Sequence, residues 1–291
     1  MDANLNAEDD TFYREYTSPE AIAKYTRTTA GAGINSLLER EYKEVYLEAL
    51  RALPAELKRQ PLRILEFGCG GGMNLLHLVS VLSHHHFDIE VAVGTDFSPV
   101  LIEAANKEAQ RFLSPQQQAH VQFWVAKNET LFQDLSVASG RDSGHLENYF
   151  QFIIGVNTVR YCHRAGRQLD CARDIFRLLA PGGVCVVIDM NNRFPAFRDA
   201  LKDKLYRRQV PAEESYLPSL EEYTAPFQQT GFEILRSEHF CWIPHSGGRF
   251  LTGLLRSLSP ALNVIAPSRA MRSLVVGKKP SSSISPVAHC G

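Results

Sequence analysis

Two periodicities of hydrophobic and polar residues divide the chain into predicted helices and strands. From about Thr11 to Leu53, apolar residues recur every three or four positions, as at Tyr42, Val45 and Ala49, which predicts amphipathic helix. From residue 61 onward, apolar runs of strand length take over and are separated by helical patterns. The predicted strands are residues 63–67, 89–96, 121–125, 150–156, 184–189, 232–235 and 272–277.

Helical patterns lie between most of these strands. Ser98-Pro99 starts a helix that runs to about Phe112, and a helix over residues 168–179 ends at Pro181-Gly182-Gly183. Strands that alternate with helices form βαβ units, so we expect an α/β fold with a doubly wound, parallel sheet covered on both faces. Residues 1–10, which are acidic, and residues 281–291, which are rich in Ser and Pro, are expected to be disordered.

Composition narrows the class of protein. The 291 residues are 44% hydrophobic and 22% charged, which excludes disorder for most of the length. The net charge is -1, whereas a general nucleic-acid binder is basic so that it can neutralise phosphates. No stretch reaches the roughly 18 apolar residues of a membrane span, and the N-terminus lacks the apolar segment of a signal peptide. We therefore expect a cytoplasmic protein.

The six cysteines are scattered along the chain. They do not form the close Cys/His pairs of a zinc site or the dense framework of a small secreted protein. We expect reduced, buried thiols and no bound metal. The cysteines are Cys69, Cys162, Cys171, Cys185, Cys241 and Cys290.

A glycine-rich turn, residues 68–72, separates the first predicted strand from the helix that follows. Glycine has no Cβ and tolerates positive φ, so such a turn lets the backbone approach a ligand closely. Asp96 ends the next strand, where its carboxylate can accept hydrogen bonds from both hydroxyls of a ribose. Gly70 and Asp96 together predict an adenosine site at the carboxyl ends of the strands, with a tight packing turn as the alternative.

Two residues beside the turn indicate which adenosine ligand is bound. The dinucleotide fingerprint requires a glycine where Met73 stands. Glu66, just before the turn, would repel a pyrophosphate but attract a cation. The sequence therefore favours a cationic adenosine ligand over a nicotinamide cofactor.

Three motifs follow one another along the chain: Glu66-Phe67-Gly68-Cys69-Gly70-Gly71-Gly72, then Asp96-Phe97-Ser98, then Leu178-Leu179-Ala180-Pro181-Gly182-Gly183. Together they resemble the E/D-x-G-x-G-x-G, D-x-S and L-L-x-P-G-G motifs of class I S-adenosylmethionine-dependent methyltransferases. The resemblance covers about residues 12–280. It implies S-adenosylmethionine as cofactor and a Rossmann-like sheet of seven strands whose last strand is antiparallel. It also implies a helical lid over residues 11–60 and a methyltransferase domain over residues 61–280.

The resemblance implies a role for each matching residue. Gly68 and Gly70 would line the methionine part of the cofactor, with Glu66 near its ammonium group. Asp96 would bind the ribose and Phe97 would flank the adenine. One departure is the segment Ala126-Lys127-Asn128-Glu129, where many relatives have Gly-Asp. Either Asn128 or Glu129 could accept a hydrogen bond from the adenine amino group. Lys127 could not, because its cation has no acceptor.

The lid would contribute three further residues. Tyr16, Tyr25 and Arg27 would reach the cofactor carboxylate, for which a guanidinium is suited; the alternative is a helix cap with surface polar groups. By resemblance, Asn157 would touch the amino acid portion of the cofactor. The complete predicted cofactor set is Tyr16, Tyr25, Arg27, Glu66, Gly68, Cys69, Gly70, Asp96, Phe97, Asn128, Glu129 and Asn157.

Methyl transfer from a sulfonium needs little from the protein beyond alignment of the acceptor and removal of a proton. His163, which follows the fourth strand, is the predicted general base, since an ordinary histidine pKa of about 6.5 suits that task. The alternative is a histidine that braces the next helix. The predicted acceptor-binding residues, for which ordinary packing is the alternative, are Tyr161, Phe194, Phe197, Trp242 and His245.

The predicted function is methyl transfer to an oxygen, nitrogen or carbon of a small-molecule acceptor in specialised metabolism. The alternative is a non-catalytic S-adenosylmethionine-binding regulatory or partner subunit. Neither nucleic acid nor a membrane span is expected. The apolar stretch from Phe250 to Ile265 is expected to cover the core, with a lipidic acceptor as the alternative. The basic run over residues 193–208 is expected to be a solvated helix face, and His84-His85-His86 a surface loop.

Overall fold

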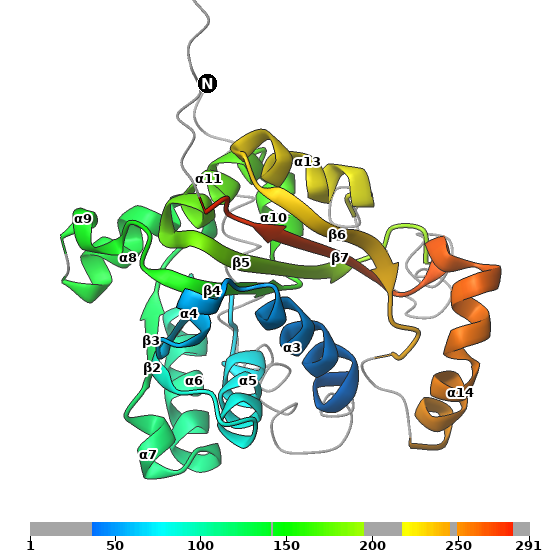
Figure 1. The fold of residues 1–291 in the computed structure, drawn as a ribbon, viewed down its shortest axis with the longest axis horizontal. Coiled ribbons are helices and arrows are strands. Elements are labelled where there is room, and N and C mark those ends of the chain that lie inside the picture. The colour runs from blue at the N-terminus through cyan, green and yellow to red at the C-terminus, as the bar shows by residue number, and fades with distance from the viewer. Residues whose placement is uncertain (1–36, 141, 195–216, 245–248, 282–291) are drawn as a thin grey trace, which may run out of the picture.

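Seven strands form one sheet in the computed structural model, which describes residues 37–140, 142–194, 217–244 and 249–281 (Figure 1). The strands are β1 (Leu62–Phe67), β2 (Ile89–Asp96), β3 (Val121–Val125), β4 (Phe150–Val156), β5 (Leu179–Met190), β6 (Glu233–Phe240) and β7 (Arg272–Lys278). Their order in the sheet is β3-β2-β1-β4-β5-β7-β6. Strands β1 to β5 pair in parallel, whereas β7 runs antiparallel to both of its neighbours. The predicted seven-stranded sheet with an antiparallel last strand is therefore confirmed.

Helices cover both faces of this sheet (Figure 1). Alternate residues of a strand point to opposite faces, so the continuous apolar runs of the central strands supply two cores. Ile64 and Phe152 belong to the core beneath α3, α5 and α6, whereas Leu65 and Ile153 belong to the core beneath α8, α10, α11 and α13. The helices are η1 (Leu37–Tyr42), α3 (Lys43–Arg51), α4 (Ala55–Lys58), α5 (Met73–His84), α6 (Pro99–Phe112), α7 (Pro115–Gln118), η2 (Asn128–Thr130), α8 (Leu131–Ser139), α9 (Ser143–Leu146), α10 (Val159–Arg164), α11 (Gln168–Leu178), α13 (Leu220–Thr230), α14 (Arg249–Ile265) and η5 (Pro267–Arg269).

The described part of the predicted N-terminal helical region is an integral layer of the core. Tyr42 and Tyr46 are both fully buried. The Tyr46 ring packs edge-to-face on Phe152 of β4 at a centroid distance of 6.3 Å, and the Tyr42 ring lies 6.1 Å from Phe240 of β6. These contacts fix η1 and α3 against the sheet.

Strand β5 begins earlier than the sequence predicted. We expected a helix to Leu179 and a strand from Val184, but β5 starts at Leu179, which pairs with Phe150 of β4. A register shift between β4 and β5 accommodates the Pro-Gly-Gly segment, and Gly182 has a φ of +79° that other residues rarely adopt. The segment Pro181-Gly182-Gly183, which was predicted to end the helix, is therefore an irregular part of β5.

The strand order reverses between β1 and β4, because the chain moves outward from β1 to β2 and β3 and then returns to the other side for β4. In a doubly wound sheet, ligands bind at such a switch point, outside the carboxyl ends of the strands. The glycine turn after β1, Asp96 at the end of β2 and the segment after β4 all lie at this edge. Among the described residues, no helix is long and apolar enough to cross a membrane.

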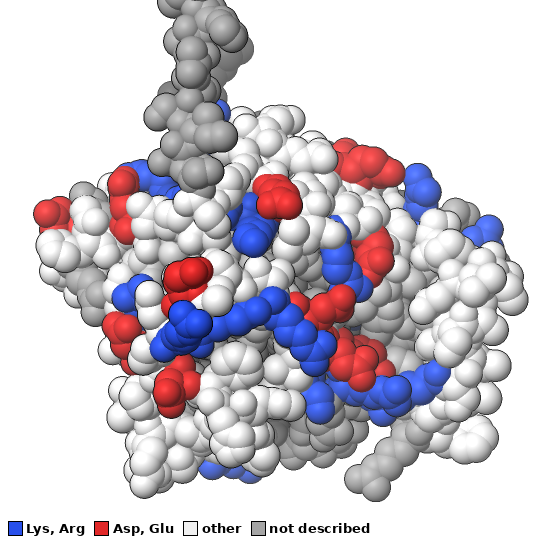
Figure 2. Space-filling model, viewed as in Figure 1, with Lys and Arg blue, Asp and Glu red and all other residues white. Residues whose placement is uncertain are grey.

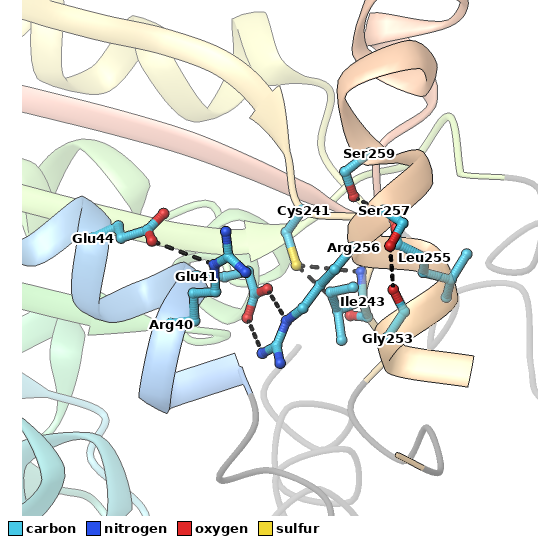
Figure 3. Close-up of polar contacts among 10 residues, drawn as sticks. All are labelled: Arg40, Glu41, Glu44, Cys241, Ile243, Gly253, Leu255, Arg256, Ser257 and Ser259. Atoms are coloured by element: carbon cyan, nitrogen blue, oxygen red, sulfur yellow. Dashed lines mark hydrogen bonds and ion pairs between the residues drawn. The ribbon is translucent and has the colours of Figure 1, made fainter. Parts of the chain in front are cut away.

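Helix α14 differs most from its prediction. The expectation that this stretch covers the core holds for Leu255, which packs on the buried Cys241 and Ile243, but not for Phe250, Leu254 and Leu258, which are 87%, 47% and 45% exposed. The polar residues Arg256 and Asn263 of α14 also contact the rest of the protein, Arg256 through Glu41 of η1 (Figure 3). Two surface and burial predictions hold: the three adjacent histidines are exposed, and the five cysteines within the described residues are buried with free thiols.

Candidate active site

The glycine turn is shaped by contacts on two of its glycines and by open space at a third. A Cβ on Gly68, whose φ is +63°, would lie 2.0 Å from Oγ1 of Thr158, and one on Gly72 would lie 2.9 Å from the Phe123 ring. A Cβ on Gly70 would meet no atom within 4 Å. The turn is therefore pressed against the protein at both ends and open in the middle, which leaves room for a ligand beside Gly70.

Asp96 binds the same turn from the end of β2. The backbone N–H of Gly70 donates to Oδ2 of Asp96 at 2.9 Å, and that of Ser98 donates to Oδ1 at 3.0 Å. Asp96 is 6% exposed, and this burial raises the pKa of its carboxyl group. Each carboxylate oxygen can accept a second hydrogen bond. The open space and the remaining acceptor capacity together fit the ribose predicted there.

Glu66 lies behind the turn and is fully buried. The side-chain amide of Asn74 donates to its Oε1 at 3.0 Å, and the backbone N–H of Leu75 donates to its Oε2 at 2.8 Å. Burial raises the pKa of Glu66 to about 8, although both hydrogen bonds oppose that rise. The carboxyl group is thus held at the start of α5 and takes up a proton easily near neutral pH.

Residues after β3 and β4 complete this edge of the sheet. The side-chain amide of Asn128 donates to Oγ1 of Thr158 at 2.6 Å. Asn157 has a φ of +55°, which is uncommon for a residue other than glycine. Its Oδ1 is buried without a hydrogen-bond partner among the described residues. An unsatisfied buried acceptor in a strained backbone segment is typical of a binding site.

The comparisons with known proteins agree with this geometry. A family model described as "Methyltransferase domain" matches residues 38–237, which is more than half of the chain. The chain belongs to the methyltransferase family. It is a class I S-adenosylmethionine-dependent methyltransferase, and S-adenosylmethionine is its cofactor. The chain has no match among curated protein sequences.

Solved structures share the fold of this methyltransferase at low sequence identity. The CMeT domain of the citrinin polyketide synthase superposes with a TM-score of 0.57 at 20% identity, over 93% of this chain. The chain spans 59% of the length of that structure. Magnesium protoporphyrin IX methyltransferase from Synechocystis PCC 6803, with bound SAH, gives a TM-score of 0.55 at 12% identity, over 93% of this chain and 100% of the other. A SAM-dependent methyltransferase from Aquifex aeolicus gives 0.51 at 13% identity, over 93% and 98%.

The structure brings most of the described cofactor residues of the methyltransferase to one edge. Cys69 is buried within the turn, where its N–H donates to the carbonyl of Thr95 at 2.7 Å. Phe97 follows β2 and is half-buried, and Glu129 lies in η2 after β3. The roles of these residues toward the cofactor stay predictions. Tyr16, Tyr25, Arg27, Phe197 and His245 lie outside the described residues.

His163, the predicted general base, lies on the side of α10 that faces α13. Its ring packs edge-to-face on Tyr223 at a centroid distance of 5.5 Å, and burial lowers its pKa. A lowered pKa keeps the ring neutral and able to accept a proton at pH 7. The contact with Tyr223 is also what the alternative, a histidine that braces the helices, requires. The catalytic role therefore stays a prediction.

The remaining acceptor candidates lie on different elements. Phe194 is half-buried shortly after β5, and Tyr161 lies on α10 directly after β4. Trp242 follows β6, and its indole N–H donates to Oδ1 of Asn263 in α14 at 2.7 Å. That bond gives the indole of Trp242 a structural role, namely to tie α14 to the segment after β6.

Sequence reasoning missed Asp189, at the end of β5, and Arg160, which together hold the predicted acceptor-binding residue Tyr161. Asp189 is fully buried and accepts hydrogen bonds from the N–H of Met190 at 2.8 Å and of Arg160 at 3.1 Å. The Arg160 guanidinium lies 3.6 Å from Asp189, donates to the Tyr161 hydroxyl at 2.7 Å and lies 4.7 Å from the centre of the Tyr161 ring. A signal was present, since an acid at the end of β5 matches the position of Asp96 at the end of β2.

Proposed function

We propose that this methyltransferase methylates an oxygen, nitrogen or carbon of a small-molecule acceptor that binds at the carboxyl ends of β4 and β5. The observation that carries the proposal is the group of Asp189, Arg160 and Tyr161. The buried carboxylate fixes the guanidinium, and the guanidinium in turn fixes the phenol, so two polar groups are held rigidly beside the strained Asn157. Positioning of the acceptor is the main task of a protein whose donor is already activated.

The distribution of charge supports a small acceptor. Figure 2 shows acidic and basic side chains interspersed on one face of the molecule, without a large area of a single sign. A nucleic-acid acceptor would require a basic track that neutralises several phosphates. The net charge of -1 agrees with the mixed surface.

The experiment is a labelling screen with S-adenosylmethionine that carries an isotope in its methyl group. The full chain is incubated with fractionated metabolite extracts, and label is followed separately into small molecules, protein and nucleic acid. Label in the small-molecule fraction supports the proposal, and label found only in a macromolecular fraction contradicts it. Cofactor binding measured by calorimetry, with no transfer to any fraction, would instead favour the non-catalytic partner subunit.

Matched variants make the screen specific. Asp96→Ala removes a predicted cofactor contact and should abolish both binding and transfer. Tyr161→Phe removes only the hydroxyl that Arg160 holds, so it should leave cofactor binding intact and reduce transfer. A Tyr161→Phe variant that transfers label at the wild-type rate would show that the acceptor binds elsewhere.

A further inference from the structure

Tyr46 of α3 carries a buried polar group that makes no hydrogen bond. The side chain is fully buried, and its hydroxyl has no partner among the described residues. A buried hydroxyl without a partner destabilises the folded state. Phenylalanine at this position would supply the same ring contact on Phe152 without that penalty. The hydroxyl of Tyr46 therefore points to a task other than packing.

The direction of α3 turns this hydroxyl toward the cofactor edge of the sheet. Tyr42, one turn before Tyr46, packs on Phe240 at the end of β6. The end of β6 pairs with the start of β7, which pairs in turn with the end of β5. The N-terminal end of α3 thus lies at the carboxyl ends of the parallel strands. Long side chains of a helix point back toward its N-terminus, so the Tyr46 phenol extends toward that edge.

Glu66 lies on the same face of the sheet, beside this phenol. Phe152, on which the Tyr46 ring packs, is paired with Ile64 of β1. Glu66 is two residues further along β1, so it faces the same side about 7 Å closer to the carboxyl end. Burial raises the pKa of the Tyr46 phenol, and the nearby Glu66 carboxylate raises it further. The phenol therefore keeps its proton and can act as a donor toward Glu66.

The Glu66 carboxylate has two unused acceptor positions. Each of its oxygens accepts one hydrogen bond, from Asn74 or from Leu75, and each can accept a second one. One of the two positions is predicted to face the ammonium group of the cofactor. The other can accept from a donor of the protein.

The other titratable groups that face Glu66, within the part of the chain that the structure describes, cannot supply this donor. They are Asp96 at the end of β2 and Cys69 in the glycine turn. The Asp96 carboxylate is an acceptor, and the Cys69 thiol donates to the carbonyl of Gly70 at 3.6 Å. Among these groups, the donor that is still unused is the hydroxyl of Tyr46.

We propose that Tyr46 is a positioning residue of the cofactor site. Its hydroxyl donates to the ionised Glu66 carboxylate, directly or through one water molecule, and so holds that carboxylate toward the ammonium group of S-adenosylmethionine. This role requires the cofactor to bind beside Glu66. It does not depend on which acceptor is methylated.

The test compares Tyr46→Phe with the wild type by calorimetry with S-adenosylmethionine at pH 7, in two buffers of different ionisation enthalpy. The matched control is Tyr42→Phe, which removes another buried hydroxyl without a hydrogen-bond partner among the described residues. Of the charged groups around Tyr42, Arg272 rather than Glu66 acts most on its pKa. Both variants keep the aromatic ring, so each should fold with about the thermal unfolding midpoint of the wild type.

We expect Tyr46→Phe to bind the cofactor about tenfold more weakly and to release fewer protons on binding, because Glu66 loses a donor that stabilises its ionised form. Tyr42→Phe should bind the cofactor and release protons like the wild type. In the background of Glu66→Gln, which has no carboxylate, Tyr46→Phe should change the affinity by about twofold or less.

Three results would overturn the proposal. The first is wild-type affinity and proton release in Tyr46→Phe. The second is an equal loss of affinity with and without the Glu66 carboxylate, which would show that Tyr46 acts on the cofactor independently of Glu66. The third is wild-type affinity and proton release in Glu66→Gln itself, which would show that the cofactor binds away from Glu66.

Discussion

Glu66→Gln tests whether the buried carboxyl group behind the glycine turn holds a proton at neutral pH. The pKa of Glu66 is raised from an ordinary 4.5 to about 8 by burial. Between these values the folded protein binds a proton that the unfolded chain has lost, so the free energy of unfolding falls as the pH rises. The slope is about 1.4 kcal/mol per pH unit and flattens near pH 8, so the wild type should lose about 2 kcal/mol between pH 6 and pH 8.

The variant should keep the local structure while removing the titration. The oxygen of the introduced carboxamide can accept from the N–H of Leu75, and its nitrogen can donate to Oδ1 of Asn74 once the Asn74 side-chain amide turns over. Protonated Glu66 can make the same two bonds. Because Glu66 of the unfolded wild type is already ionised at pH 6, Glu66→Gln should be about 2 kcal/mol more stable than the wild type at pH 6 and about 4 kcal/mol more stable at pH 8.

The assay is urea unfolding of the cofactor-free protein at both pH values, followed by tryptophan fluorescence. Glu90→Gln is the matched control, because it makes the same change at an exposed position of β2, and it should follow the wild type. His163 and His239, whose pKa values are lowered by burial, titrate in all three proteins and cancel in the differences. A difference between wild type and Glu66→Gln that is equal at pH 6 and pH 8 would refute the reasoning.

The same group should couple proton release to cofactor binding. A cationic ligand close to Glu66 favours the ionised carboxylate and so lowers its pKa. Binding of S-adenosylmethionine at pH 7 should then release up to about one proton from the wild type and none from Glu66→Gln. Calorimetry in two buffers of different ionisation enthalpy measures the release. Equal proton release by the wild type and Glu66→Gln would show that the ammonium group of the cofactor does not bind close to Glu66.

Three further predictions concern the edge of the sheet. Gly68→Ala should lower the thermal unfolding midpoint strongly, because its Cβ would lie 2.0 Å from Oγ1 of Thr158. Gly70→Ala should fold, because its Cβ would meet no atom of the protein, but calorimetry should show a loss of cofactor affinity, because the Cβ would enter the space left for the ligand. Tyr161→Phe should reduce transfer to the acceptor about tenfold and leave the cofactor Kd unchanged, which a radiolabel assay and calorimetry test side by side. His163→Ala should reduce turnover by about 10² to 10⁴-fold if the ring is the base. Because burial lowers the pKa of His163, the acid limb of the wild-type rate profile should lie below pH 6.5. Turnover near the wild-type rate would show that the ring only packs on Tyr223.

The parts of the fold that the sequence predicts well are those fixed by local patterns and by motif resemblance. The strand runs, the glycine turn and Asp96 follow from residues that are close together in the chain. The contacts that shape the site join distant segments instead. Thr158 lies against Gly68, 90 positions earlier in the chain, and Arg160 of α10 forms an ion pair with Asp189 of β5. Periodicity carries no information on such pairings, so the contact between Asp189 and Arg160 emerges only from the assembled sheet, although the acid at the end of β5 is visible in the sequence.

Helix α14 and His163 show the same limit for orientation. The spacing of leucines in α14 establishes that one side of the helix is apolar, but not the direction in which that side points. The direction depends on Glu41, 215 positions away, whose carboxylate binds Arg256 and holds the polar side inward. In the same way, the position of His163 after β4 leaves open whether its ring faces the acceptor or a neighbouring helix, and Tyr223 of α13 draws it toward the helix layer. A side chain on a helix therefore acquires its function from partners that the local sequence does not contain.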